Sequence, residues 1–171
     1  MRVWRYGDNV NTDQLFPGKY TYTCSKPDEI KPHLLEDLDP EFARSVASGD
    51  MLLVGSNFGC GSSREQPVLG FKAVGISSIV GISFARIFYR AAINQGLILI
   101  ECPEAVSSYK EGDQMAVDMA GGRIVVGTAS FSFPPLPPEI LAIRDAGGLL
   151  EFTRKKLSAK GTVRSPSTIS A

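Results

Sequence analysis

The feature that most constrains the fold of this chain is a glycine-rich run between an apolar stretch and a short helical stretch. The run reads Gly-Ser-Asn-Phe-Gly-Cys-Gly-Ser-Ser-Arg-Glu-Gln and occupies residues 55–66. Residues 51–54 before it are all apolar, as in a buried strand, and residues 67–73 after it fit a short helix. Three glycines within seven positions let the backbone turn sharply and approach a ligand, because no Cβ stands in the way. We therefore predict a tight strand-to-helix loop.

The second half of this loop has the residue types of an anion site. Ser62 and Ser63 each have an acidic or amide residue three positions later, which is the capping-box spacing, so either serine fits as the helix cap. Unpaired N–H groups, the positive end of the helix dipole and the Arg64 guanidinium would then converge on one small volume. A Walker loop is excluded because the run lacks lysine, and a dinucleotide fingerprint because Arg64 replaces its third glycine. A purely structural turn stays open.

Residues 57–66 resemble the signature of the small subunit of 3-isopropylmalate dehydratase, the swivel domain of the aconitase superfamily. The resemblance continues through residues 7–13, 17–20, 83–90 and 94–97, and covers roughly residues 1–155 in order. It implies an α/β fold for residues 1–157, a swivelling β/β/α domain of the aconitase C-terminal type with a mixed sheet layered with helices. Residues 158–171 lose apolar content, so we expect a mobile tail there.

The resemblance also implies a function. It indicates a hydro-lyase of leucine biosynthesis that moves a hydroxyl between adjacent carbons of a malate-type acid and is active only with a large subunit. Ser62 matches the catalytic base, whereas Ser63 and Arg64 match substrate-binding residues. Arg64 would hold a carboxylate through its forked donors. A serine hydroxyl is a very weak acid, so only a pocket that stabilises its anion lets it act as a base. The partner's iron would polarise the departing hydroxyl as a Lewis acid.

Residues 20–23 read Tyr-Thr-Tyr-Thr and bear on the substrate. The corresponding segment reads Tyr-Leu-Arg-Thr in archaeal-type isopropylmalate enzymes, and a second Arg replaces the Thr in homoaconitase-like ones. Tyr22 and Thr23 are therefore candidate substrate-binding residues, and losing the arginine favours a branched apolar substituent over a second anionic arm. A related dehydratase (2,3-dimethylmalate dehydratase or homoaconitase), a non-catalytic anion-binding module and a purely structural assembly subunit are the alternatives.

The cysteines do not form a cluster-binding pattern. Cys24, Cys60 and Cys102 lie 36 and 42 positions apart, without a Cys-x-x-Cys pair. In the resembled family the ligands of the [4Fe-4S] cluster belong to the partner large subunit, so we expect this chain to bind no cofactor and no metal itself. His33, the single histidine, lies in a polar stretch with proline, and we expect a solvated side chain without an orienting partner.

Composition excludes further classes of partner. The 18 basic and 18 acidic residues cancel, so the chain has no electrostatic footprint for nucleic acid or an anionic membrane. The sequence lacks an apolar signal region or a stretch long enough to span a bilayer. We expect a cytoplasmic protein.

The remaining patterns predict elements around the loop. Apolar strands separated by helices indicate a parallel sheet with right-handed crossovers. Residues 8–13 suggest a turn held by Asx side chains and not a calcium loop. The expected strands cover residues 1–6, 76–82 and 97–100, with a hairpin at 114–119 and 123–126 and an extended connector at 131–138. The expected helices are a broken one at 28–35 and others at 40–47, 84–95 (capped by Ser83), 138–146 and 149–157.

Overall fold

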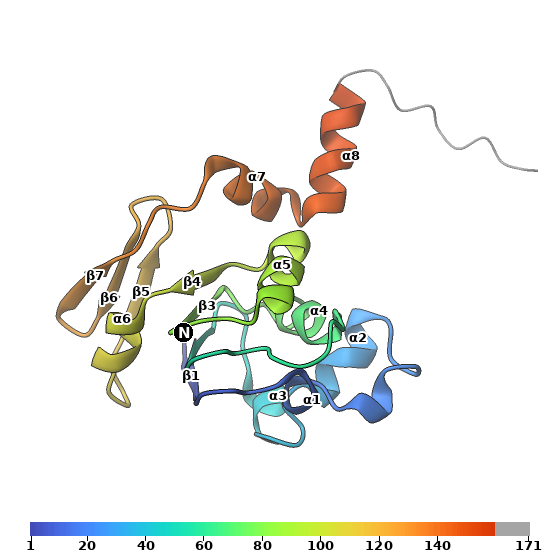
Figure 1. The fold of residues 1–171 in the computed structure, drawn as a ribbon, viewed down its shortest axis with the longest axis horizontal. Helices are drawn as coiled ribbons and strands as arrows, with labels where there is room; N and C mark the ends of the chain where they lie inside the picture. The colour runs from blue at the N-terminus through green and yellow to red at the C-terminus, as the bar shows by residue number, and fades with distance from the viewer. Residues whose placement is uncertain (160–171) are drawn as a thin grey trace, which may run out of the picture.

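The computed structural model describes residues 1–159, which form two sheets covered by helices (Figure 1). The first sheet has four strands, all parallel, in the order β1-β2-β3-β4. Helical segments connect successive strands, so the parallel sheet predicted from the strand and helix pattern is confirmed. Its strands are β1 (Val3–Tyr6), β2 (Met51–Val54), β3 (Ser78–Gly81) and β4 (Leu99–Glu101).

Both faces of the parallel sheet are buried at its centre, which explains why β2 is apolar throughout, whereas the edge strands β1 and β4 each carry one exposed charged residue, Arg5 and Glu101. In β2, Leu52 belongs to one hydrophobic core and Leu53 to the other. Side chains alternate between the faces of a strand, so a strand with two covered faces needs apolar residues at every position. The first core lies under the helices between β1 and β4, and the second lies between the sheet and the C-terminal half of the chain.

The first face is covered by short helices followed by two longer ones. The expected broken helix at 28–35 is confirmed as two short pieces, and the helix expected at 40–47 is reduced to four residues. These elements are α1 (Thr12–Leu15), η1 (Gly18–Tyr20), α2 (Pro27–Ile30), η2 (Lys31–His33), α3 (Phe42–Ser45), α4 (Gln66–Ala73) and α5 (Arg86–Gln95).

The second layer is α6 (Pro103–Ser108) with a separate antiparallel sheet of β5 (Met115–Asp118), β6 (Arg123–Val126) and β7 (Ala129–Ser132). The predicted hairpin is β5 and β6. The prediction of an extended connector at 131–138 is wrong at its first two residues, because residues 129–132 pair with β6 as a third strand. The side chains of β7 alternate between half-buried (Ala129, Phe131) and exposed (Ser130, Ser132), but this alternation is only four residues long and runs into the proline-rich connector, which hid the strand.

The described chain ends in α7 (Pro138–Ala146) and α8 (Leu149–Ala159). The last helix runs two residues further than predicted, so Ser158 and Ala159 are helical and not part of a tail. The rest of the predicted tail lies outside the described residues. None of the side chains of α8 is buried, and the helix projects from the body (Figure 1). Among residues 1–159, no helix is long and apolar enough to cross a membrane.

Candidate active site

The glycine-rich run forms a tight loop after β2, as predicted. Gly59 has φ = 79°, and a Cβ there would lie 2.2 Å from the ring of Phe88 on α5. Gly61 has φ = 103°, a conformation that side chains disfavour. Glycine is therefore required at both positions. Gly59 lets α5 pack closely against the loop, and both residues adopt a left-handed backbone.

The start of the loop is fixed by the segment before α5. The N–H of Phe58 donates to the Ser83 carbonyl (3.1 Å), and the N–H of Asn57 donates to the Ser83 hydroxyl (2.8 Å). The prediction that Ser83 caps α5 is wrong, because the helix begins at Arg86 with Ala85 as its N-cap. The Ser83 hydroxyl is used to hold the loop instead.

The middle of the loop is fixed by α1. The N–H of Ser62 donates to the hydroxyl of buried Thr12 (2.9 Å). Thr12 is placed by Asn11, whose side chain accepts from the N–H groups of Asp13 and Gln14, so the predicted Asx turn is confirmed. The Ser62 side chain is exposed, and its Oγ accepts a hydrogen bond from the N–H of Arg64 (3.3 Å).

Neither Ser62 nor Ser63 caps α4, contrary to the prediction. The helix begins at Gln66 after Glu65, without a side-chain cap. Pro67 explains the shift, because a helix capped at either serine would place this proline where an intrahelical N–H is needed. Starting at Gln66 puts Pro67 in the first turn, where its missing N–H costs nothing. Both serines are consequently left on an exposed loop.

Arg64 connects this loop to the segment that carries Tyr22 and Thr23. Its guanidinium donates to Asp13 Oδ1 and to the Thr21 hydroxyl (2.8 Å), and its side chain is only 14% exposed. Its Nε is buried without an acceptor. Gly18 allows this packing, since a Cβ there would lie 2.9 Å from the Asp13 carboxylate. Sequence reasoning missed Asp13 and Thr21 as partners, although the Asn-Thr-Asp turn was the signal that could have found the first.

Tyr22 projects from this segment and is 99% exposed. The Thr23 hydroxyl donates to the Tyr20 carbonyl (3.4 Å), so it supports the turn. The structure therefore brings Arg64 onto the Tyr22 segment through Thr21, but it shows no contact between Arg64 and either Tyr22 or Thr23 within the described chain.

The base of this segment is a polar cluster around Glu36. The Tyr20 ring stacks on His33 (3.7 Å between centroids), and His33 Nδ1 lies 2.7 Å from the Glu36 carboxylate. The prediction that His33 has no orienting partner is therefore wrong. Hydrogen bonds from Lys19 and then His33 lower the pKa of Glu36 to about 2.

The described residues do not provide a cluster-binding set. Cys24 and Cys102 are buried in the two different cores, and Cys60 lies half-buried beside the Asn9 carbonyl. Between residues 1 and 159, no group of three or more His, Cys, Asp or Glu side chains is arranged to hold a metal.

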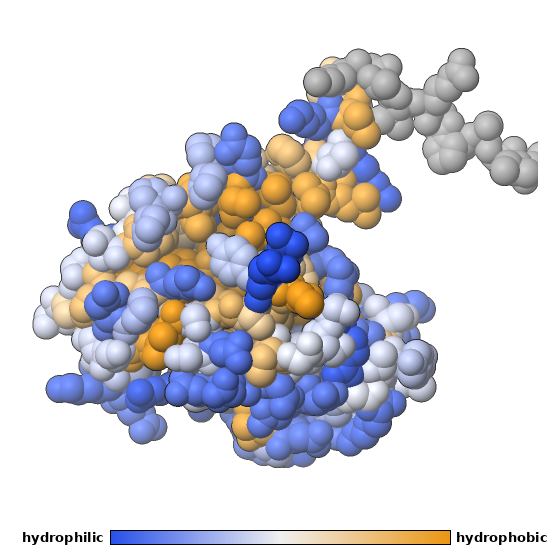
Figure 2. All heavy atoms as spheres, viewed as in Figure 1, coloured by the Kyte–Doolittle hydropathy of each residue, from blue (hydrophilic) through white to orange (hydrophobic). Residues whose placement is uncertain are grey.

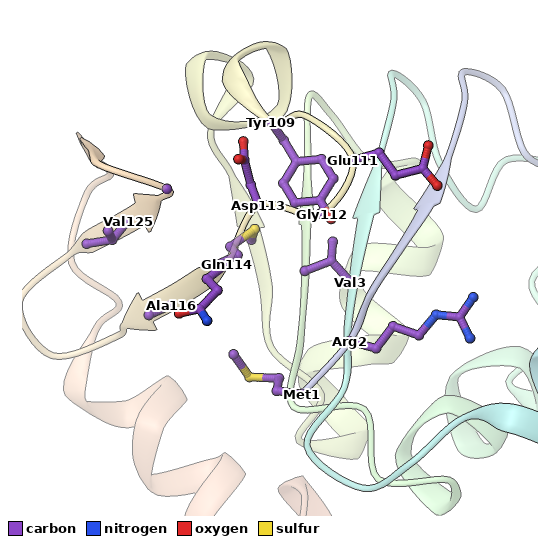
Figure 3. A pocket seen from close by; sticks show the side chains of 12 residues that line it. Met1, Arg2, Val3, Tyr109, Glu111, Gly112, Asp113, Gln114, Ala116 and Val125 are labelled. Atoms are coloured by element: carbon purple, nitrogen blue, oxygen red, sulfur yellow. The ribbon is translucent and has the colours of Figure 1, made fainter.

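A cavity of about 800 Å³ lies elsewhere, between the N-terminal residues and the antiparallel sheet (Figure 3). Met1 and Val3 line one side, and Gln114 and Ala116 line the other. Arg2 also lines this cavity, but its guanidinium is stacked on Trp4, 3.8 Å from the ring centroid. None of the loop residues 55–66 lines this cavity. The candidate site is thus an exposed loop surface, which a second surface would have to enclose.

The fold and its glycine-rich loop define a swivel domain of the aconitase superfamily, and residues 7–105 match the Aconitase C-terminal domain family. Similar chains include the 3-isopropylmalate dehydratase small subunits of Thermodesulfovibrio yellowstonii (43% identical; 92% of this chain and 94% of that one) and Caldanaerobacter subterraneus subsp. tengcongensis (48% identical; 90% and 96%). A crystal structure of 3-isopropylmalate dehydratase from Methanocaldococcus jannaschii has a TM-score of 0.85 at 36% identity, with 94% and 95% covered. The chain belongs to the family of 3-isopropylmalate dehydratase small subunits. The expected swivel fold is confirmed.

Proposed function

We propose that this chain is the small subunit of a heteromeric 3-isopropylmalate dehydratase of leucine biosynthesis, and that it supplies a serine base and a substrate-binding arginine to a large subunit. One observation carries the proposal: an exposed Ser62 hydroxyl stands beside Arg64 on a loop whose backbone is fixed by Thr12, Ser83 and two required glycines. A rigid backbone that presents free hydroxyls is suited to chemistry, because it loses little entropy when substrate binds.

The surroundings of Ser62 suit a base. Its Oγ already accepts a hydrogen bond from the Arg64 N–H (3.3 Å), and the same contact would stabilise an alkoxide. In this proposal Ser62 takes a proton from the carbon next to a substrate carboxylate. Ser63, exposed beside it, would hold the substrate through its hydroxyl.

Arg64 is suited to hold a carboxylate in this site. A guanidinium has five N–H donors in a fixed fork, and the structure assigns two of them contacts, to Asp13 and Thr21. The hydrogen bond that Arg64 donates to Asp13 orients the fork and leaves further donors for a substrate carboxylate. Tyr22, fully exposed on the linked segment, would contact the substituent that distinguishes one malate-type acid from another.

We further propose that the large subunit holds the [4Fe-4S] cluster. The three cysteines of this chain lie in separate environments, two of them inside the hydrophobic cores. Ligands so arranged do not fit a cluster, which needs several thiolates around one centre. The exposed and unenclosed position of the Ser62 loop supports a site that is complete only when the large subunit covers it.

The test is turnover of 3-isopropylmalate by the chain mixed with its large subunit. Ser62→Ala should lower kcat by roughly three orders of magnitude or more, because it removes the base and not the loop. Ser130→Ala, on exposed β7, is the matched control and should keep wild-type turnover. Affinity for the large subunit should be the same in all three proteins.

Two outcomes would contradict this function. A Ser62→Ala mixture that keeps more than about a tenth of wild-type kcat would assign the base to water or to the partner. A wild-type mixture without turnover, with a chain that binds malonate or phosphate alone, would instead support the anion-binding module.

A further inference from the structure

A second hollow lies between α5, β4 and the connector after β7, and we call it the α5 groove. Its volume is about 480 Å³. Its apolar walls are formed by Phe84 before α5 and by Phe133 and Leu136 in the connector after β7. Arg86 and Arg90 of α5 line the same groove, and both are exposed. The groove thus combines an apolar floor with two cations.

The two arginines are not neutralised by the rest of the described chain. Arg44, Arg64, Arg144 and Arg154 each form an ion pair, whereas neither guanidinium of the groove forms one within residues 1–159. No acidic residue lies in the first turn of α5, so the dipole of the helix adds to their positive potential.

One carboxylate, Glu101, also lines the groove. Its charge acts on the Tyr89 hydroxyl, because burial and then Glu101 raise the pKa of that tyrosine. Glu101 forms no ion pair with either arginine. The positive charge of the groove is therefore available to a ligand from outside.

The groove is linked to the glycine-rich loop through the interior contacts of Phe84 and Ala85. Phe84 packs edge-on against Phe58 of the glycine-rich loop, and the Ala85 N–H donates to the Phe58 carbonyl (2.9 Å). Ile87, between the two arginines in sequence, is 53% exposed. In Figure 2 strongly hydrophilic side chains stand over α5 directly beside a hydrophobic area that extends toward α7. A body that covers the Ser62 loop would therefore extend naturally over the α5 groove.

We propose that the α5 groove is a docking surface for an acidic segment of the large subunit. Aspartate or glutamate side chains of that segment pair with Arg86 and Arg90, and an apolar residue between them packs on Phe84 and Leu136. Arginine suits this role because its planar fork binds carboxylates in two contacts while its face covers apolar surface. This inference rests on the proposed function, since it places the partner that the Ser62 loop requires.

The test is the affinity of the full chain for purified large subunit, measured by calorimetry over a range of salt concentrations. Arg86→Glu/Arg90→Glu should bind roughly tenfold or more weakly at low salt and lose much of the salt dependence, because charges at an interface act through screened attraction. At saturating large subunit its kcat should stay within about twofold of wild type, since neither residue is part of the catalytic loop.

Two variants control for charge and for folding. Arg5→Glu/Arg123→Glu makes the same change in net charge on β1 and β6, away from the groove, and should bind as wild type does. Arg86→Lys/Arg90→Lys keeps the charge and should recover most of the lost affinity at low salt. Equal thermal melting of all variants excludes misfolding as the cause.

The results separate this inference from the proposed function. Wild-type affinity in Arg86→Glu/Arg90→Glu, with normal turnover, would overturn the docking surface alone. Arginine-dependent binding of inorganic phosphate to the free chain, with unchanged affinity for the large subunit, would assign the groove to a small anion and also overturn it. A wild-type chain that neither binds nor activates the large subunit would overturn the proposed function and this inference together.

Discussion

At the scale of single residues, Arg64 is the most informative side chain of the candidate site. It is nearly buried, it is held by Asp13 and Thr21, and its Nε–H has no acceptor. A buried donor without a partner costs about 1–3 kcal/mol, and that cost is recovered when an acceptor arrives. In the proposed site a substrate carboxylate would be such an acceptor only after the surrounding segment shifts, because the described chain encloses Nε. The free chain therefore holds Arg64 oriented but not fully satisfied, as a binding residue should be.

Tyr22 carries a prediction about the substrate. The side chain is 99% exposed, so Tyr22→Arg should fold as wild type does and add a guanidinium where a longer acid would place its distal carboxylate. The wild-type enzyme should prefer 3-isopropylmalate or 2,3-dimethylmalate to homocitrate. Tyr22→Arg should raise kcat/KM for homocitrate roughly tenfold, the value of one charge-assisted hydrogen bond.

The measurement is kcat/KM for the three acids with wild type, Tyr22→Arg and Tyr22→Phe, each saturated with large subunit. Tyr22→Phe keeps the ring and should leave the ranking unchanged. Preference of the wild-type enzyme for homocitrate, or an unchanged ranking in Tyr22→Arg, would show that the partner subunit sets the specificity.

At the scale of elements, Glu36 ties η1 and η2 together and so holds the base of the Tyr22 segment. Its carboxylate accepts from Lys19 (2.7 Å) and lies against His33, and these contacts lower its pKa to about 2. Because the folded pKa lies below the unfolded value of about 4.3, this stabilisation is present above the unfolded pKa and is lost as pH falls toward 2.

The Glu36→Gln variant should therefore have a lower melting temperature than the wild-type chain at pH 7. The difference should be only about 2–4 °C, because solvent screens the interaction with the exposed lysine. The gap should narrow as the pH falls from 5 to 3, since the unfolded wild-type chain then takes up a proton at Glu36 that the folded carboxylate does not bind. Thermal melts of both proteins at pH 7, 5, 4 and 3 measure this difference in melting temperature. A gap that widens on acidification would mean that Glu36 is not ionised in the folded chain.

The sequence predicts elements well where burial is complete and poorly where it is partial. β2 is a continuous apolar run and is buried at every position, and Gly96, with φ = 76°, ends α5 as expected. By contrast β7 has only half-buried or exposed side chains, so its pairing with β6 depends on tertiary structure. Helix starts were the other failure. Ser62 and Ser83 have the residue type of a cap, but their contacts lie with Thr12 and Asn57, which are distant in sequence.

At the scale of the whole molecule, the candidate site lies on the surface and not in an enclosed cavity. The glycine-rich loop contacts the Tyr22 segment through Arg64 and Thr21, and it contacts Phe84 of the α5 groove through buried Phe58. The positions of these groups could not be predicted from local sequence, because Asp13, Thr21 and Phe84 reach the loop only through the fold.

The last prediction follows from this incomplete site. The isolated chain should show no dehydratase activity and no brown chromophore, because Cys24 and Cys102 are buried apart and Cys60 faces a backbone carbonyl. Anaerobic purification without the large subunit, followed by iron analysis and absorption spectroscopy, measures this directly. Adding the large subunit should supply both the chromophore and turnover, and the iron should stay with the large subunit when the two are separated. About four irons per chain in partner-free protein would require a ligand set that these three thiols do not form, and would place the cluster on this subunit.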